Sequence, residues 1–117
     1  MIRLITLVTL LISFNLQAKE IDLGSKLPSE DIKMLDVSGK KISLGDAKGE
    51  NGLLVIFSCN TCPWVIKWED RYVELTKTYK PKGIGVIAIN SNEITFQSSD
   101  SMEKMKEHAK DNNYNFY

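Results

Sequence analysis

The sequence predicts an α/β fold built around parallel strands. Two uninterrupted apolar runs, Leu53–Phe57 and Ile84–Ile89, are separated by an amphipathic segment of helical periodicity. Strands that are apolar on both faces are typical of a sheet covered by helices, and a helix between two such strands predicts parallel pairing. The chain has 117 residues, which is enough for one domain.

The charge balance excludes one class of partner. The chain has 15 basic and 15 acidic residues, and no run of five or six like charges. Nucleic-acid-binding domains normally carry a basic excess, so we expect no nucleic-acid partner. With 43% hydrophobic and 26% charged residues the composition is that of a globular protein, and its function must be sought in local motifs.

The N-terminus has the features of a secretory signal peptide. Arg3 precedes an uncharged run over residues 4–18, which is shorter than the ~20 residues that span a membrane and ends on the small residue Ala18. We predict a signal peptide over 1–18 and an exported domain over 19–117, in the periplasm or otherwise outside the cytoplasm. The alternative is an uncleaved anchor, which would be the chain's one contact with a membrane.

The first half of the domain is predicted to form strands. Ile32–Leu35 and Ile42–Leu44 flank a Gly-containing turn and predict a short hairpin. Asp46–Gly52 is polar and Gly-rich, which predicts a surface loop. The apolar run Leu53–Phe57 follows, and its lack of polar alternation places it in the middle of the sheet.

A helix of about 16 residues is predicted next, because apolar residues recur at spacings of three and four. The apolar stripe consists of Val65, Trp68, Tyr72, Leu75 and Tyr79. Pro81 and Gly83 predict its end. We expect Trp68 in the core, whereas Trp64, off the stripe, is expected either to be partly buried or to form a substrate-docking surface.

A second helix and one more strand are predicted near the end of the chain. Asp100 and Glu103 form a capping-box-like pair, and the apolar face of this helix is formed by Met102, Met105 and Ala109. Tyr114–Tyr117 begins a further strand. The predicted order is β-β-β-α-β-α, and we expect a chain truncated at its C-terminus, because nothing follows Tyr117 to complete the sheet.

The two cysteines form the motif that carries chemistry. Cys59 and Cys62 have C-x-x-C spacing and lie between a predicted buried strand and a helix. A helix N-terminus stabilises a thiolate, which is the nucleophile of disulfide exchange, and the spacing lets one thiol resolve a mixed disulfide formed by the other. A C-x-x-C joined to a βαβ pattern therefore predicts a redox centre with Cys59 and Cys62 as its catalytic pair.

The start of the helix is open to two interpretations. Pro63 suits the first helical position, which would make Cys62 the N-cap. Alternatively the helix starts at Asn60 or Thr61, which leaves Cys59 as the exposed attacking thiol.

Two structural interpretations of the cysteine pair compete with catalysis. A zinc site would need two more ligands, and His108 is the only imidazole in the chain, so we expect no metal. A permanent structural disulfide is compatible with export, but the strand-to-helix position favours catalysis.

Leu53–Val65, with the sequence LLVIFSCNTCPWV, resembles the thioredoxin-fold redoxins. The closest resemblance is to the peroxiredoxin-like (alkyl hydroperoxide reductase/thiol-specific antioxidant type) thioredoxin family with its C-N-x-C-P centre. The likeness extends through Asp70–Leu75 and Gly83–Asn92, and it includes Leu23–Pro28 and Asp36–Lys40.

This resemblance implies a thioredoxin-like fold and a centre that cycles between dithiol and disulfide without a cofactor. Some family features have no match here. Ser58 stands where thioredoxins usually have Trp, Leu53–Phe57 contains no buried acid, and no counterpart of the cis-proline loop is present. The family's last strands and final helix would lie beyond Tyr117.

Three functions are compatible with these residues. The first is an exported thiol–disulfide oxidoreductase, an enzyme in which Cys59 attacks and Cys62 resolves, with protein disulfides or a thiol reductant as partners. The second is a peroxiredoxin-like thiol peroxidase, suggested by Cys62–Pro63, in which Cys62 reacts with peroxide and Cys59 resolves. The third and most remote is copper delivery, for which His108 would have to be a ligand, whereas a half-packed or solvated His108 is the simpler interpretation.

Overall fold

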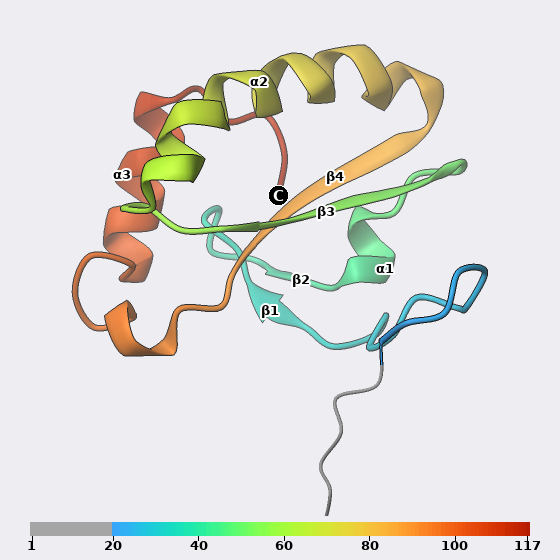
Figure 1. Cartoon of the computed structure of the whole chain (residues 1–117), viewed down its shortest axis with the longest axis horizontal. Helices are drawn as coiled ribbons and strands as arrows, with labels where there is room; N and C mark the ends of the chain where they lie inside the picture. The colour runs from blue at the N-terminus through green and yellow to red at the C-terminus, as the bar shows by residue number, and fades with distance from the viewer. Residues whose placement is uncertain (1–19) are drawn as a thin grey trace, which may run out of the picture.

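A small parallel sheet forms the centre of the computed structural model, which describes residues 20–117 (Figure 1). Strands β3 (Gly52–Ser58) and β4 (Ile84–Asn90) pair in parallel, with Leu53 opposite Gly85. Helix α2 (Pro63–Tyr79) and a 3-10 turn, η1 (Lys80–Lys82), connect them. The predicted α/β arrangement with parallel pairing is confirmed. The predicted signal peptide lies outside the described residues, within which no helix is long and apolar enough to cross a membrane.

The prediction that Leu53–Phe57 is a central strand is not confirmed. Among residues 20–117, β4 is the only strand that pairs with β3. Leu54 is exposed, and Phe57, at the end of the strand, exposes 72% of its surface. The run is apolar on both faces as expected, but the described part of the chain covers it incompletely.

The hairpin is shorter than predicted, and a helix begins where the end of its second strand was expected. β1 (Met34–Leu35) pairs antiparallel with β2 (Lys41–Ile42), and Leu44, expected in a strand, begins helix α1 (Leu44–Ala47). α1 also occupies the start of the predicted loop. Its cause is a capping box, in which the Ser43 side chain accepts from the Asp46 amide and the Asp46 carboxylate accepts from the Ser43 amide.

The Asp46 carboxylate is strongly stabilised in this capping box. A hydrogen bond from the Lys33 side chain, together with those from Ser43, lowers the pKa of Asp46 to about 2. Asp46 therefore stays ionised, and can cap α1, in all but strongly acidic solution.

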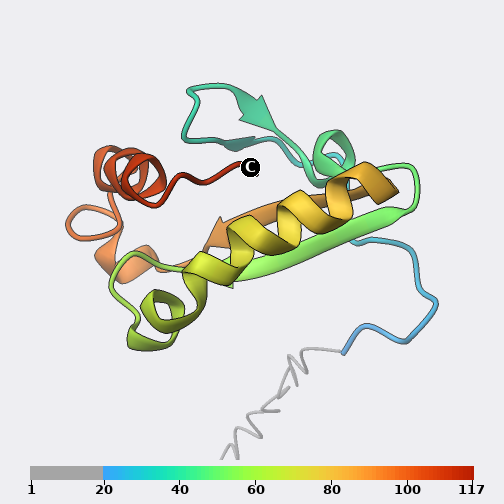
Figure 2. The same ribbon diagram turned by 90° about the horizontal axis from the view of Figure 1, so that it is seen from above.

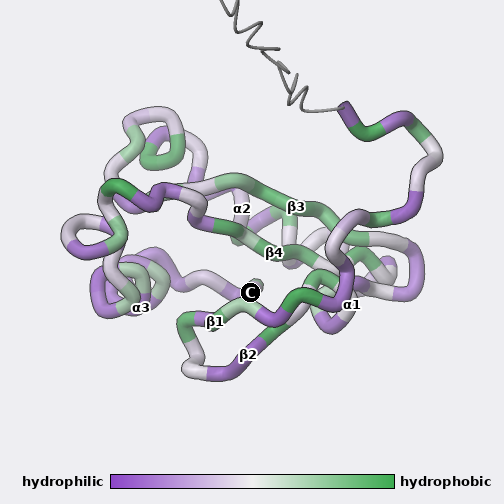
Figure 3. The backbone as a smooth tube through the Cα atoms, turned by 90° about the horizontal axis from the view of Figure 1, so that it is seen from below, coloured by the Kyte–Doolittle hydropathy of each residue, from purple (hydrophilic) through white to green (hydrophobic). Residues whose placement is uncertain are grey.

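The two faces of the sheet are covered by different elements (Figure 2). α2 lies along one face, while the hairpin and α1 lie on the other. The core on the hairpin side is formed by buried residues and the apolar side chains packed against them, namely Leu44, Ala47, Ile87, Leu27, Met34, Ile42, Leu53, Val55 and Ile89. The hydrophobic colouring of β3 and β4 in Figure 3 agrees with their position between the two layers.

Helix α2 buries a different stripe from the predicted one. Val65 is buried as expected, but the next buried positions are Glu69 and Thr76. Trp68 was expected in the core and is 45% exposed, with its ring against the Arg71 guanidinium at 3.8 Å. The stripe is rotated toward Glu69 because this carboxylate has hydrogen-bond partners in the tertiary structure, which periodicity of apolar residues does not detect.

The second predicted helix exists, but Asp100 does not cap it. α3 (Met102–Asp111) follows a 3-10 turn, η2 (Glu93–Thr95), and its N-cap is Ser101, whose hydroxyl accepts from the Lys104 amide. Asp100 is instead fully buried. The capping-box prediction for Asp100 and Glu103 is therefore wrong, because several cap-competent residues precede α3 and Asp100 makes stronger contacts elsewhere.

The C-terminal segment lies beside β4. The Ala88 amide donates to the Tyr117 carbonyl at 2.7 Å, and the Tyr117 amide donates to the Val86 carbonyl at 3.4 Å. Tyr117 thus pairs with the edge of β4, but the strand predicted over Tyr114–Tyr117 does not form in the described structure.

Candidate active site

The C-x-x-C motif lies at the carboxyl end of β3, where the chain enters α2. Cys59 directly follows the strand, and Cys62 is the N-cap of α2 with Pro63 at the first helical position. This is the first of the two helix starts that the sequence allowed, and it follows from the fixed φ of proline. Both cysteines are free thiols and partly exposed.

The two thiols have opposite electrostatic environments. Burial and the neighbouring Cys62 thiol raise the pKa of Cys59 above its usual value. The backbone N–H groups of Val65 and Trp64 lower the pKa of Cys62, although neither makes a capping hydrogen bond of standard geometry to its sulfur. The charge of the helix N-terminus thus acts on Cys62, which becomes the more acidic thiol.

Asn60, between the cysteines, is bound to the loop that precedes α3. The Asn60 amide donates to Asp100 Oδ1 at 2.7 Å, and Asn60 Nδ2 donates to the Ser99 carbonyl at 2.8 Å. Sequence reasoning missed this contact, because about forty residues separate the two segments. The one local signal was the polar run Ser98–Ser101, which contains more capping residues than a single helix needs.

A second polar cluster joins α2 to α3 and the C-terminal segment. Glu69 Oε2 lies 2.6 Å from His108 Nε2 and accepts from the Tyr114 hydroxyl at 2.9 Å. Burial and the hydrogen bond to Glu69 raise the pKa of Tyr114. His108 is thus half-packed, and its Nε2 is occupied by Glu69, which gives no support to a metal-ligand role. In residues 20–117 no group of three or more His, Cys, Asp or Glu side chains could hold a metal ion.

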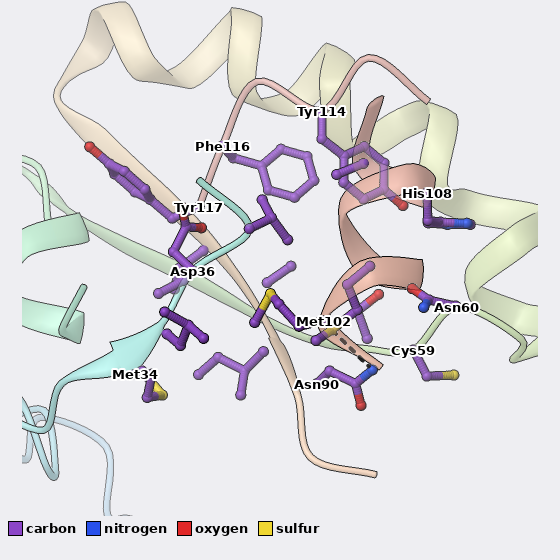
Figure 4. Close-up of a pocket in the computed structure, with 18 of the residues that line it drawn as sticks. Met34, Asp36, Cys59, Asn60, Asn90, Met102, His108, Tyr114, Phe116 and Tyr117 are labelled. Atoms are coloured by element: carbon purple, nitrogen blue, oxygen red, sulfur yellow. Dashed lines mark hydrogen bonds between the residues drawn. The ribbon is translucent and has the colours of Figure 1, made fainter. Parts of the chain in front are cut away.

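A cavity of about 380 Å³ opens beside the motif (Figure 4). It lies among the hairpin, β4, α3 and the C-terminal segment, and Cys59 and Asn60 are at its edge. Figure 4 draws the Cys59 sulfur pointing away from the cavity. Met102, Met105 and Ala109, which form the predicted apolar face of α3, are partly buried and line it.

Trp64 lies in the first turn of α2, next to the motif. It exposes 69% of its surface, and Lys67 Nζ lies 5.6 Å from its ring centroid. Of the two interpretations of Trp64, this exposure fits a surface position available to a substrate better than burial does.

The comparisons with known proteins agree with this architecture. Residues 22–117 match the Redoxin family model. The chain belongs to the Redoxin family. Membership of this family confirms the predicted thioredoxin-like fold and indicates thiol-dependent redox chemistry in general. Both cysteines lie inside the matched range.

Two solved structures resemble this redoxin. An uncharacterized conserved protein from Geobacillus kaustophilus is 36% identical, with a TM-score of 0.64 over 68% of this chain and 42% of that one. A hypothetical protein from Sinorhizobium meliloti 1021 is 28% identical, with a TM-score of 0.72 over 84% of this chain and 52% of that one. The redoxin thus spans about half the length of each. No curated protein sequence matches it at a significant level.

Proposed function

We propose that the chain is an exported thiol–disulfide oxidoreductase whose centre is the Cys59–Cys62 pair. The observation that carries the proposal is the placement of two free, partly exposed thiols of unequal acidity between a strand and a helix N-terminus. A more acidic thiol that attacks and a less acidic one that resolves are the two parts that disulfide exchange needs. The partners are protein disulfides and a dithiol reductant.

The order of the two thiols is proposed to be the reverse of the sequence-based expectation. Cys62 has the lowered pKa and therefore the larger thiolate fraction near neutral pH, which favours Cys62 as the attacking residue. Cys59, whose pKa is raised, suits the resolving step, in which it attacks a disulfide already held beside it.

The reaction transfers two electrons to the substrate. The Cys62 thiolate forms a bond to one substrate sulfur and breaks the substrate disulfide, which releases one thiolate that takes a proton from water. Cys59 then loses its proton and attacks the Cys62 sulfur, which forms the Cys59–Cys62 disulfide and releases the second substrate thiol. An external dithiol must reduce the centre before another cycle.

Reciprocal trapping variants test both the function and the order. Cys59→Ser should accumulate a mixed disulfide between Cys62 and an oxidised protein substrate such as insulin, whereas Cys62→Ser should accumulate little. Mass spectrometry of non-reduced peptides identifies the adduct. An adduct on Cys59 alone would restore the sequence-based order, and absence of any adduct together with no insulin reduction by the unaltered chain would contradict the function.

A thiol peroxidase is the second candidate, and it is favoured by the same acidic Cys62 followed by Pro63. The Cys62 thiolate would attack a hydroperoxide, forming the sulfenic acid and releasing an alcohol or water. Cys59 would then condense with it, which forms the disulfide and releases water. Arg71, the one arginine among residues 20–117, lies against the Trp68 ring. Peroxide consumption no faster than that of free cysteine would exclude this function.

A further inference from the structure

Asp100 is a fully buried carboxylate that belongs to no helix cap. It lies in the connection between β4 and α3, and its relative exposure is 0%. A buried carboxylate requires hydrogen-bond donors, since burial without them is costly. The closest donors to Asp100 include the Asn60 amide at 2.7 Å from Oδ1, the Thr95 hydroxyl at 2.5 Å from Oδ2, and Asn92 Nδ2 at 3.4 Å from Oδ2.

These contacts divide the two carboxylate oxygens between two parts of the chain. Oδ2 accepts from Thr95 and Asn92, which belong to the same connection as Asp100. Oδ1 accepts from the backbone of Asn60, inside the C-x-x-C motif. Asn60 is held a second time, because its side chain donates to the Ser99 carbonyl at 2.8 Å. The first residue between the cysteines is therefore bound to the 99–100 segment at both its backbone and its side chain.

The carboxylate is well suited to hold this loop. Burial raises the pKa of Asp100, but the hydrogen bonds from Thr95, Asn60, Asn90 and Asn92 outweigh burial and leave the pKa below its usual value. Asp100 is thus an ionised acceptor at neutral pH, and hydrogen bonds to ionised acceptors are stronger than neutral ones.

We propose that Asp100 is a positioning residue that fixes the Cys59–Cys62 loop with its two thiols side by side, and so favours formation of their disulfide. The proposal rests on the dithiol–disulfide function above. Fixing two reacting groups near each other raises their effective concentration. A loop without this restraint would separate the thiols for part of the time and form the disulfide less readily.

The equilibrium between the chain and glutathione measures this effect without any protein substrate. In full-length chains, Asp100→Ala should lower the equilibrium constant for forming the Cys59–Cys62 disulfide by about tenfold, which corresponds to about 30 mV. Asp100→Asn keeps an oxygen that can accept from Asn60 and should lie between Asp100→Ala and the unaltered chain. Circular dichroism establishes that each variant is folded.

If Asp100→Ala does not fold, substitutions of the two residues between the cysteines test the proposal instead. Asn60→Ala removes the bond to the Ser99 carbonyl and should lower the constant by a few-fold. Thr61→Ala is the matched control, since Thr61 is exposed and its side chain makes no hydrogen bond in the described part of the chain. It should change the constant by less than twofold.

The outcomes separate this proposal from the function on which it rests. An unaltered chain that forms no Cys59–Cys62 disulfide at any glutathione ratio contradicts the proposed function. An unaltered chain that does form it, with a folded Asp100→Ala whose constant is within twofold, contradicts the positioning role alone. Equal decreases of the equilibrium constant in Asn60→Ala and Thr61→Ala would contradict it as well. The decrease would then not depend on the contact between Asn60 and the 99–100 segment.

Discussion

At the scale of single residues, the acidity of Cys62 is a consequence of where α2 begins. Pro63 occupies the first helical position and leaves Cys62 as the N-cap, so the amides of Trp64 and Val65 face its sulfur. Cys59 lies three residues before this N-cap, and its partial burial and the neighbouring Cys62 thiol raise its pKa. The two thiols, with only two residues between them in the sequence, thus have opposite shifts in pKa.

We expect single-cysteine variants to titrate in opposite directions. In Cys59→Ser, the rate of Cys62 alkylation by iodoacetamide should rise with pH through a midpoint below the ordinary value of 9.0. In Cys62→Ser, the midpoint for Cys59 should lie above 9.0, because burial opposes its ionisation. Both variants in urea serve as controls and should titrate alike. Equal midpoints in the folded variants would contradict the assignment of Cys62 as the thiolate.

The role of Glu69, like that of Cys62, depends on the groups that surround it in the folded chain. Its exposure is 9%, although it lies on a helix with many charged residues at the surface. Its Oε2 is shared between His108 and Tyr114, which connects α2 to α3 and the C-terminal segment. We therefore regard Glu69 as a structural carboxylate.

Replacing Glu69 by Gln should destabilise the fold. The substitution keeps the shape but exchanges charge-assisted hydrogen bonds for neutral ones, so the free energy of unfolding should fall by about 1–2 kcal/mol. Urea denaturation of the full chain measures the change. Glu74→Gln, on the same helix and in an exposed pair with Lys77, is the control and should cost less than about 0.5 kcal/mol. Equal losses in the two variants would contradict a special role for Glu69.

At the scale of elements, α1 lies so close to β4 that residue 85 must be glycine. A Cβ built on Gly85 would lie 1.8 Å from the Ala47 carbonyl oxygen and 2.9 Å from the Gly49 nitrogen. Backbone atoms cannot move aside as the end of a side chain can. The packing of α1 on the start of β4 thus depends on the missing side chain at residue 85.

Gly85→Ala should therefore loosen or displace α1. Overpacking of this kind costs about 1–3 kcal/mol or more, and thermal denaturation should detect the loss. Gly45→Ala is the control, since Gly45 is inside α1 and a Cβ there would lie 3.2 Å from the Glu30 side chain and 3.3 Å from the Glu30 carbonyl oxygen, which is much farther than the 1.8 Å at Gly85. The gain in helix propensity there, about 1 kcal/mol, offsets that contact. A Gly85→Ala protein as stable as Gly45→Ala would show that α1 does not pack on β4 in solution.

At the scale of the whole molecule, export is the part of the proposed function that lies outside the described residues. Cleavage after Ala18 would produce a protein that begins at Lys19, just before the range that matches the Redoxin family. The cleavage signal requires a small residue at position 18 and tolerates variation at the residue before it.

We expect full-length chain expressed in a bacterial host to be recovered outside the cytoplasm with Lys19 at its N-terminus, as measured by intact mass. Ala18→Arg should block processing and leave the precursor mass, whereas Gln17→Arg is the matched control and should be processed. An unprocessed chain held in the membrane fraction would favour the uncleaved anchor. Unprocessed chain in the cytoplasm would contradict export.

The sequence alone determined the main elements and the cysteine pair. Gly and Pro positions, apolar periodicity and the C-x-x-C spacing are local properties, so they were sufficient for α2, for β3 and β4 with their parallel pairing, and for the position of the motif between strand and helix. The same local rules did not decide between the two possible starts of α2. They also placed Trp68 in the core and Asp100 in a cap, because both are acceptable choices for an isolated segment.

The tertiary structure decided what depends on contacts between distant residues. Glu69 is buried against His108 of α3 and Tyr114 of the C-terminal segment, whereas Trp68 lies at the surface. Ser101, not Asp100, caps α3, because Asp100 instead accepts a hydrogen bond from the Asn60 amide inside the motif. The free energy of a buried polar group depends on its partners, and those partners are known only when the chain has folded.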